Sequence, residues 1–211
     1  EHTSRGLGDV YKRQVIDDNN CIINQDITLT EPINFNSTYT VSDYNGFNIS
    51  CFNNNDGLID FTLGGSVPPY SFDWSGPNNF QSSNEDNNNL YAGVYTLQVT
   101  DINSCTYYET VILNEPTDFS STINSTTNFN GFDISCNGFS DGSIDFEVTG
   151  SVPPYSYFWN SGQITQDISS VNAGAYIVNV LDNNGCSHSN TITLTEPVSY
   201  THLTLPTRLP V

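Results

Sequence analysis

Cysteine is the residue type in this chain whose number and spacing could do chemistry, because two thiols form a disulfide and clustered thiolates bind zinc. The cysteines fall into two classes. Cys21, Cys105 and Cys186 each lie ten residues before the Glu of a Glu-Pro pair, whereas Cys51 and Cys136 each lie five residues before an Asp-Gly. No Cys-x-x-Cys spacing occurs. The sequence therefore predicts no zinc site, and it predicts disulfides among Cys51, Cys105, Cys136 and Cys186.

The other residue types that carry catalysis are poorly placed for it. Nucleophilic catalysis needs a base near a Ser or Cys, and His188, the sole His of residues 15–197, sits between two serines in a turn-like stretch. Asp60 and Asp145 qualify as a glycosidase carboxylate pair by number only. They repeat at one position of a recurring pattern, which suggests a surface feature. We therefore expect no catalytic residue and no enzyme activity.

Calcium is the more serious ligand question, because Asp carboxylates and Asn carbonyls in loops are suitable hard ligands. The candidate ligands are Asp56, Asp101, Asp141 and Asp182, which lie in or beside Asn- and Asp-rich stretches. The sequence contains no EF-hand or nonapeptide calcium motif. The alternative is that these side chains shape turns. No other cofactor is expected.

The two ends of the chain differ from the rest and are interpreted as adapter-derived and non-native, over residues 1–14 and 198–211. The resemblance to translated sequencing adapter covers residues 4–14 and 198–208. The stretch DVYKRQ back-translates to GATGTGTATAAGAGACAG, and the reverse complement of that DNA, read in another frame, encodes the VSYTHL of the C-terminal stretch. All the basic residues of the chain lie in these ends: Arg5, Lys12, Arg13 and Arg208.

The remaining segment is strongly acidic and lacks cationic side chains. Of the 23 Asp and Glu residues only Glu1 and Asp9 lie outside residues 15–197, so that segment carries a net charge of −21. Without Lys or Arg it cannot neutralise phosphates, which excludes nucleic acid as a partner. It has no apolar run near the length of a membrane span, so membrane insertion is not expected. With 12 Tyr, 12 Phe and 2 Trp the chain has enough large apolar surface for folded domains.

Internal repetition dominates the sequence and indicates a tandem array. Residues 65–71 (GSVPPYS) recur as residues 150–156, and residues 92–95 (AGVY) recur as residues 173–176 (AGAY). The first pair is offset by 85 residues and the second by 81. We place this difference in the Asn-rich stretch 84–89, interpreted as a surface loop. The predicted organisation is a C-terminal piece of a preceding repeat (15–32), a complete repeat (33–116) and another (117–197).

Short strands rather than helices are expected within each repeat. Ile59, Phe61 and Leu63 alternate with polar residues, as a half-buried strand requires. Clusters of Gly, Pro, Asn and Asp separate such strands, which favours a sandwich with hairpin connections. The predicted fold is all-β, with tandem immunoglobulin-like or fibronectin-like β-sandwich repeats of about 80 residues.

Two pairs of aromatic residues mark the expected core. Trp74 and Trp159 are placed on the third strand, where they fill the core; stacking on carbohydrate is the alternative. Tyr95 and Tyr176 follow Ala-Gly at the start of a late strand, as the corner tyrosine of Greek-key sandwiches does. Their hydroxyls are then expected to bond to nearby backbone.

Two disulfide pairings are open in such a fold. The simpler joins Cys51 to Cys105 and Cys136 to Cys186 within each repeat, and it would stabilise a repeat by roughly 4 kcal/mol on the chain-entropy model. However, the loop before the second strand and the turn after the sixth lie at opposite ends of an immunoglobulin sandwich, and cysteines placed in those two loops would be too far apart to join. Head-to-tail stacking of repeats would instead bring Cys51 close to Cys186. Either pairing implies an oxidising, extracytoplasmic compartment.

The combined motif resembles the SprB repeat, a module of the cell-surface adhesins of gliding bacteria. The pattern is carried by Cys136, residues 141–142 (DG), Gly150, residues 153–155 (PPY), Trp159, residues 173–176 (AGAY) and residues 180–186 (VLDNNGC). The chain departs from it at Ser104 and Thr149, where the family usually has Gly, and the turn at Ser104 is therefore expected to differ in shape. The resemblance implies surface display after type IX secretion and a role in adhesion or gliding.

Two classes of function follow from these observations. The leading one is a repetitive structural or adhesive segment of a secreted cell-surface protein. Its expected partners are neighbouring repeats of the same chain, and surface glycans or a solid substratum through the loops at residues 76–90 and 160–171. The alternative is a carbohydrate-binding or spacer module of a secreted polysaccharide-degrading enzyme.

Overall fold

A computed structural model describes residues 10–199, and their regular structure consists of antiparallel strands and one 3-10 turn. The all-β prediction is therefore confirmed. The chain divides into two compact units. Unit 1 comprises Glu1–Ser42 and Asp56–Leu113, and unit 2 comprises Asp43–Asn55 and Asn114–Val211. No helix among the described residues is long and apolar enough to cross a membrane.

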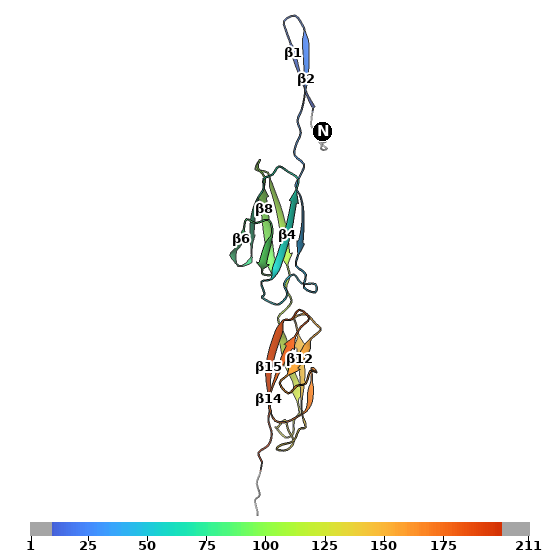
Figure 1. Ribbon diagram of the computed structural model, residues 1–211, viewed down its shortest axis with the longest axis vertical. Helices are drawn as coiled ribbons and strands as arrows, with labels where there is room; N and C mark the ends of the chain where they lie inside the picture. Colours follow the sequence, from blue (N-terminus) through green and yellow to red (C-terminus); the bar gives the residue numbers. More distant parts are fainter. Residues whose placement is uncertain (1–9, 200–211) are drawn as a thin grey trace, which may run out of the picture. The chain divides into compact units, whose positions relative to one another are not determined.

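Unit 1 contains a sandwich of a three-stranded and a four-stranded sheet (Figure 1). The strand order is β3-β4-β7 in one sheet and β6-β5-β8-β9 in the other. The elements are β3 (Asn36–Val41), β4 (Gly57–Gly64), β5 (Ser71–Gly76), η1 (Pro77–Asn79), β6 (Phe80–Ser82), β7 (Asn87–Leu90), β8 (Gly93–Thr100) and β9 (Thr106–Leu113). Neighbouring strands pair antiparallel throughout.

Unit 2 repeats this topology without a counterpart of β6. Its sheets have the orders β10-β11-β13 and β12-β14-β15, so β14 lies between its two partners. The strands are β10 (Ser120–Thr126), β11 (Gly142–Thr149), β12 (Ser156–Trp159), β13 (Ile168–Val171), β14 (Gly174–Leu181) and β15 (Ser187–Leu194). The arrangement of both units is that of an immunoglobulin-like sandwich, which confirms the predicted fold class.

Alternating burial explains why these segments form strands. In β4, Ile59 and Phe61 are buried, whereas the neighbouring Asp60 and Thr62 are exposed. Side chains of successive strand residues point to opposite faces, so one face of the strand meets the core and the other meets solvent. The same pattern runs through β8, where Tyr95 is 1% exposed.

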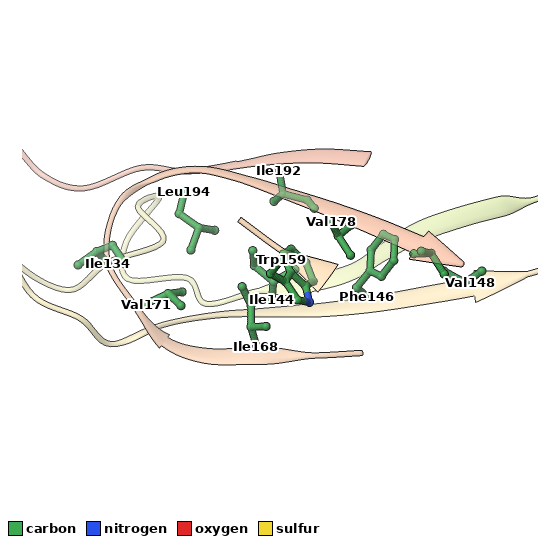
Figure 2. Packing of buried hydrophobic residues seen from close by; sticks show 11 residues of the cluster. Ile134, Ile144, Phe146, Val148, Trp159, Ile168, Val171, Val178, Ile192 and Leu194 are labelled. Atoms are coloured by element: carbon green, nitrogen blue, oxygen red, sulfur yellow. The ribbon is translucent and has the colours of Figure 1, made fainter. Parts of the chain in front are cut away.

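The core of unit 2 is one cluster of apolar side chains between its two sheets (Figure 2). Phe146 of β11 meets the ring of Trp159 of β12 edge to face, with the ring centroids 5.8 Å apart. The corresponding pair in unit 1, Phe61 and Trp74, has the same separation. Edge-to-face packing of aromatic rings adds about 0.5–1.5 kcal/mol beyond burial.

The four aromatic markers lie in or beside these cores. Trp74 is 0% exposed and Trp159 is 4% exposed, so neither ring offers a face to carbohydrate, and the stacking alternative is wrong for both. The hydroxyls of Tyr95 and Tyr176 each donate 2.9 Å to the backbone carbonyl four residues upstream. Tyr95 is buried and Tyr176 half-buried.

The length difference between the repeats lies earlier than the sequence suggested. The Asn-rich residues 87–90 form β7, which matches β13 because both pair with the start of the preceding strand of their sheet. The additional residues of unit 1 therefore fall between β5 and β7, where they form η1 and β6. Placing them at residues 84–89 was wrong, because an Asn-rich stretch here is partly strand, with Asn87 only 6% exposed.

The hairpin of β1 (Val10–Ile16) and β2 (Ile22–Thr28) has the register of β8 with β9. Arg13 pairs with Gln25 as Leu97 pairs with Glu109. Leu97 is 1% exposed in its sandwich, and a charged Arg is unsuited to such a core position unless it is paired. The non-native origin of residues 10–14 stays a prediction. The other residues assigned to adapter lie outside the described range, except Val198 and Ser199.

Candidate functional site

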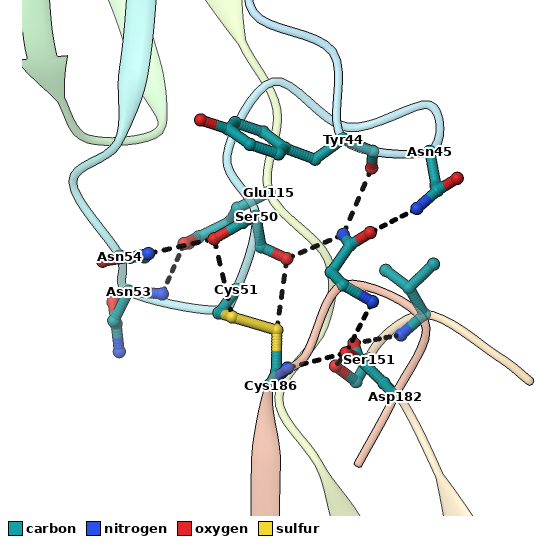
Figure 3. The surroundings of a disulfide bond; sticks show 12 residues. Tyr44, Asn45, Ser50, Cys51, Asn53, Asn54, Glu115, Ser151, Asp182 and Cys186 are labelled. Atoms are coloured by element: carbon teal, nitrogen blue, oxygen red, sulfur yellow. Dashed lines mark hydrogen bonds between the residues drawn. A yellow bond between two sulfur atoms is a disulfide. The ribbon is translucent and has the colours of Figure 1, made fainter. Parts of the chain in front are cut away.

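A disulfide joins Cys51 to Cys186, with an S–S distance of 2.03 Å and a Cα–Cα distance of 5.7 Å (Figure 3). The two residues are 135 positions apart in the chain and belong to different sequence repeats. Both lie in unit 2, because the segment Asp43–Asn55 belongs to that unit. The pairing within each repeat is therefore wrong, and the alternative bond between repeats forms. Its physical basis is the packing of the Cys51 loop, which no local pattern reveals.

Asp182 shapes the loop that presents Cys186. Its Oδ1 accepts hydrogen bonds from the N–H of Asn184 and the N–H of Cys186, both at 2.8 Å. The Cys186 carbonyl in turn accepts from the N–H of Asp182 at 3.0 Å. These bonds close a tight turn, and they fix the backbone from which the Cys186 side chain projects. Asp182 is 7% exposed, so its carboxylate depends on them for satisfaction.

The recurring GSVPPY motif binds the second carboxylate oxygen of Asp182. Ser151 Oγ donates to Asp182 Oδ2 at 2.6 Å, and the N–H of Val152 donates to the same oxygen at 3.1 Å. In unit 1, Ser66 Oγ donates to Asp101 Oδ2 at 2.6 Å. The motif therefore positions the cysteine loop of its own repeat, a role that its recurrence alone does not disclose.

Gly150 makes the motif possible because no other residue fits its place. It has a φ of +82°, and a Cβ at this position would lie 2.0 Å from the Asp118 carbonyl oxygen. The Tyr155 hydroxyl donates to the Gly150 carbonyl. Gly65 has the same surroundings in unit 1, with a φ of +81° and the Asn34 carbonyl oxygen at 2.0 Å.

The Glu of the recurring Glu-Pro pair holds the other cysteine loop. Glu115 Oε2 accepts from the N–H of Asn53 at 2.6 Å, two residues after Cys51. Glu196 Oε2 accepts from the N–H of Gly138 at 2.7 Å, two residues after Cys136. Sequence reasoning used the Glu-Pro pair only as a positional marker for one class of cysteine and gave its Glu no role. The signal for its role was the recurrence of Glu ten residues after one class of cysteine.

Asn184 is the further contact that sequence reasoning missed. Its side-chain amide donates to the carbonyl of Tyr44 at 3.2 Å and to the carbonyl of Ser50 at 2.9 Å. Its Oδ1 accepts from Asn45 Nδ2 at 2.5 Å. One side chain thus bonds at three points to the loop that carries Cys51. The sequence offered Asn184 only as part of an Asn-rich cluster.

The turn at Ser104 keeps the shape of its counterpart despite the substitution. Ser104 has a φ of +68° and Gly185 a φ of +83°. The N–H of Ser104 donates to the Asp101 carbonyl at 3.0 Å, and that of Gly185 donates to the Asp182 carbonyl at 3.2 Å. The expected difference in shape is therefore wrong, because the Asp-centred bonds hold even a Ser in the left-handed region.

The calcium candidates have these surroundings. In Asp101 and in Asp182, Oδ1 accepts hydrogen bonds from the backbone of the turn, and Oδ2 accepts from the serine of the GSVPPY motif. Asp141 accepts from the Ser135 hydroxyl and N–H, and Asp56 is half-buried. Among residues 10–199, no three His, Cys, Asp or Glu side chains gather where a metal ion would be held. Calcium binding stays a prediction. The observed contacts are hydrogen bonds by which these Asp side chains shape loops and turns.

Hydrogen bonds lower the pKa of three of the Asp carboxyls. The Ser66 hydroxyl is the main cause of the lowered pKa of Asp101, and the Ser135 hydroxyl is the main cause for Asp141. Burial acts to raise the pKa of Asp133, but donors on Thr195 and Thr126 outweigh it. Because each pKa lies below its unfolded value, the ionised carboxylates stabilise the folded state at neutral pH. That contribution is lost as the pH falls through the folded pKa.

His188 packs as part of the fold. Its ring stacks on Phe119 with centroids 5.5 Å apart, and its Nε2 lies 2.9 Å from Ser121 Oγ. Ser121 Oγ also accepts from Asn190 Nδ2 at 3.0 Å. The Ser121–His188 contact spans 67 positions, so sequence reasoning, which weighed only the adjacent serines, missed it. Asp60 and Asp145 are exposed on their strands.

The solved structures that resemble the chain have low sequence identity to it. An intimin fragment in complex with the translocated intimin receptor is 9% identical over 75% of this chain, with a TM-score of 0.41. The chain spans 63% of the length of that fragment. The Dpr2 Ig1-Ig2 and DIP-Theta complex gives 14% identity over 90% of this chain and 73% of the other, with a TM-score of 0.35. Murine CEACAM1b is 16% identical over 69% of this chain and 94% of its own, with a TM-score of 0.28.

A search of curated proteins found no match. The description of the SprB repeat family matches the chain twice, at residues 47–79 and 132–164. Each match begins shortly before one class of cysteine and extends through the Asp-Gly, the GSVPPY motif and the Trp of a unit. The resemblance drawn from the motif is thereby confirmed at both places. Residues 47–79 and 132–164 of this chain each match the SprB repeat.

Proposed function

We propose that this chain is a load-bearing repeat segment of a cell-surface adhesive protein. The observation that carries the proposal is the bond between Cys51 and Cys186, which links two repeats that the backbone already joins. Under tension, a covalent path then runs from Cys51 straight to Cys186. Residues 52–185, which include most of both sandwiches, are bypassed. A folded segment braced in this way keeps its length when pulled.

The composition fits the same role. A net charge of −21 over residues 15–197 favours solubility and resists association between chains. The SprB repeats support display on a cell surface, and with it an oxidising setting for the disulfide. The finer parts of the proposal are export by type IX secretion and action in gliding or attachment. Neighbouring repeats are the proposed partners, with a surface glycan or solid substratum as the adhesive target.

Single-molecule pulling of the full chain by its ends tests the proposal. Reduction should lengthen the fully extended chain by roughly 450–490 Å, because 135 residue steps of about 3.3–3.6 Å are released together. The Cys51→Ser variant should reach that length without reductant. Cys105→Ser is the matched control, and it should behave as the unsubstituted chain because Cys105 is free.

Two results would contradict the proposal. Bonds within each repeat would release two separate increments, each roughly 165–195 Å. If the oxidised chain already extends to its full length, and reduction adds no further length, then no disulfide links the two repeats. Either outcome removes the mechanical role derived from the bond between repeats.

A further inference from the structure

The described chain leaves three cysteines free, and all three are exposed: Cys21, Cys105 and Cys136. Each is the counterpart of a cysteine that is bonded. Cys105 and Cys21 stand where Cys186 stands, ten residues before a Glu-Pro, and Cys136 stands where Cys51 stands, five residues before an Asp-Gly. The free thiols are thus unpaired halves of the kind of bond that unit 2 contains.

The loop of Cys105 already has the form of the bonded loop of Cys186. Asp101 Oδ1 accepts from the N–H of Asn103 at 2.9 Å and from the N–H of Cys105 at 2.8 Å. The corresponding bonds at Asp182 are both 2.8 Å. The same turn occurs at Asp17, whose Oδ1 accepts from the N–H groups of Asn19 and Cys21 at 2.9 and 2.8 Å. The Asp-centred loop, which is one of the two loops that the disulfide joins, therefore has the same form in every copy, whether its cysteine is bonded or free.

The loop of Cys136 has the form of the bonded loop of Cys51. The N–H of Phe139 donates to the Cys136 carbonyl at 3.1 Å, as the N–H of Asn54 donates to the Cys51 carbonyl at 3.0 Å. The bond from Glu196 to the N–H of Gly138 matches that from Glu115 to the N–H of Asn53. The other of the two loops also has its bonded form before any partner is present.

The residues that make the amide contacts of the bonded junction have counterparts at the same repeat positions as well. Asn184 donates to the carbonyls of Tyr44 and Ser50. Asn103 stands in the position of Asn184, and Phe129 and Ser135 stand in the positions of Tyr44 and Ser50. The cysteine loops thus carry both the thiol and the polar groups that a neighbouring repeat would meet.

We propose that Cys136 forms a disulfide with the counterpart of Cys186 in the following repeat. Cys105 in turn forms one with the counterpart of Cys51 in the preceding repeat. The array then carries one disulfide between every two consecutive repeats. This inference rests on the proposed function, since it extends the brace from one junction to all of them. Each bond forms when two thiols lose two protons and two electrons to a disulfide oxidant. With oxidised glutathione as that oxidant, the products are the protein disulfide and two molecules of glutathione.

Duplication of repeats within the full chain tests the proposal. In one variant, residues 117–197 are duplicated directly after Pro197; in the other, residues 33–116 are duplicated directly after Pro116. Each variant is oxidised with glutathione at low protein concentration and digested with pepsin at acid pH. Acid conditions suppress thiol exchange, and trypsin has no site between residues 15 and 197. In each variant the second copy carries a conservative substitution next to each of its cysteines, so that peptides of the two copies differ in mass. Linked peptides are then identified by mass spectrometry.

The first variant should link Cys136 to the second copy of Cys186, and the second should link the first copy of Cys51 to the second copy of Cys105. Each variant adds two cysteines, yet the number of free thiols should stay at three. Replacing the second copy of Cys186 by Ser should return Cys136 to the free state and leave the Cys51–Cys186 peptide unchanged.

The same digests separate failure of this inference from failure of the proposed function. A retained Cys51–Cys186 peptide with Cys136 still free overturns the repeated brace alone. A bond between Cys136 and the first copy of Cys186 overturns it as well. Loss of the Cys51–Cys186 bond in all oxidised chains overturns both.

Discussion

Asp182 connects two parts of the repeat that are distant in sequence. Its carboxylate accepts from the backbone that precedes Cys186 and from Ser151 and Val152 of the GSVPPY motif. A hydrogen bond to a charged group contributes about 1.5–3 kcal/mol, and an orphaned buried donor is costly. The recurrence of Asp four residues before each cysteine of its class therefore has a structural cause.

Replacing Asp182 by Ala should lower the free energy of unfolding of unit 2 by about 3 kcal/mol or more. The reason is that four donors lose their acceptor, and at least one of them is buried. Urea unfolding followed by tryptophan fluorescence measures the change. Asp145→Ala is the matched control, because Asp145 is exposed on β11, and it should leave the midpoint almost unchanged. Equal effects of the two substitutions would remove the role assigned to Asp182.

Gly150 and Gly162 separate two costs of replacing a glycine. Both have positive φ, +82° and +90°, but only Gly150 has a backbone oxygen where its Cβ would lie. Gly162→Ala should therefore cost about 1 kcal/mol from backbone strain. Gly150→Ala should cost about 3 kcal/mol or more, because the backbone must also move away from the Asp118 oxygen. Thermal or urea unfolding of the two variants compares them, and a larger loss at Gly162 would contradict the assignment.

At the scale of elements, the segment between β5 and β7 distinguishes the units. In unit 2 the short connection from β12 to β13 brings the Thr165 carbonyl within 2.8 Å of Trp159 Nε1. In unit 1 the longer connection forms η1 and β6, and Trp74 Nε1 finds no acceptor among the described residues. An unpaired buried donor is costly, so the longer connection removes a bond that the shorter one supplies.

This difference predicts unequal effects of the same substitution. Trp159→Phe should destabilise its unit by about 1 kcal/mol more than Trp74→Phe, because only the former removes a hydrogen bond. Loss of ring volume is common to both variants and cancels in the comparison. Urea unfolding of each variant, followed by far-ultraviolet circular dichroism, gives the two changes, and fluorescence of the remaining Trp identifies the transition of the unsubstituted unit. A larger loss for Trp74→Phe would refute the account.

Strands and core were predictable because their signals are local. Alternation in β4 and β8 and the recurrence of Trp and Tyr give the sandwich without any long-range information. The bonded pair Cys51 and Cys186 was not predictable, because it depends on where the segment Asp43–Asn55 packs. Asn184 was missed for the same reason, since its acceptors lie 134 and 140 positions away. The β6 insertion was misplaced because composition suggested a loop where β7 forms.

At the scale of the whole molecule, the recurring motifs all hold the two cysteine loops in place. The GSVPPY motif and the Asp hold one cysteine loop, the Glu-Pro pair holds the other, and the disulfide joins loops from two repeats. In the chain-entropy model, a disulfide that closes a loop of this length contributes about 5 kcal/mol. The repeats of such an array would depend on an oxidising environment for part of their stability.

Counting free thiols in the oxidised 211-residue chain tests the central claim most directly. The measurement is titration with a chromogenic disulfide under denaturing conditions, on monomeric chain held at low concentration. A bond between Cys51 and Cys186 leaves three free thiols, Cys21, Cys105 and Cys136. Bonds within each repeat would leave Cys21 alone. A count of three supports the covalent link between repeats, and a count of one contradicts it.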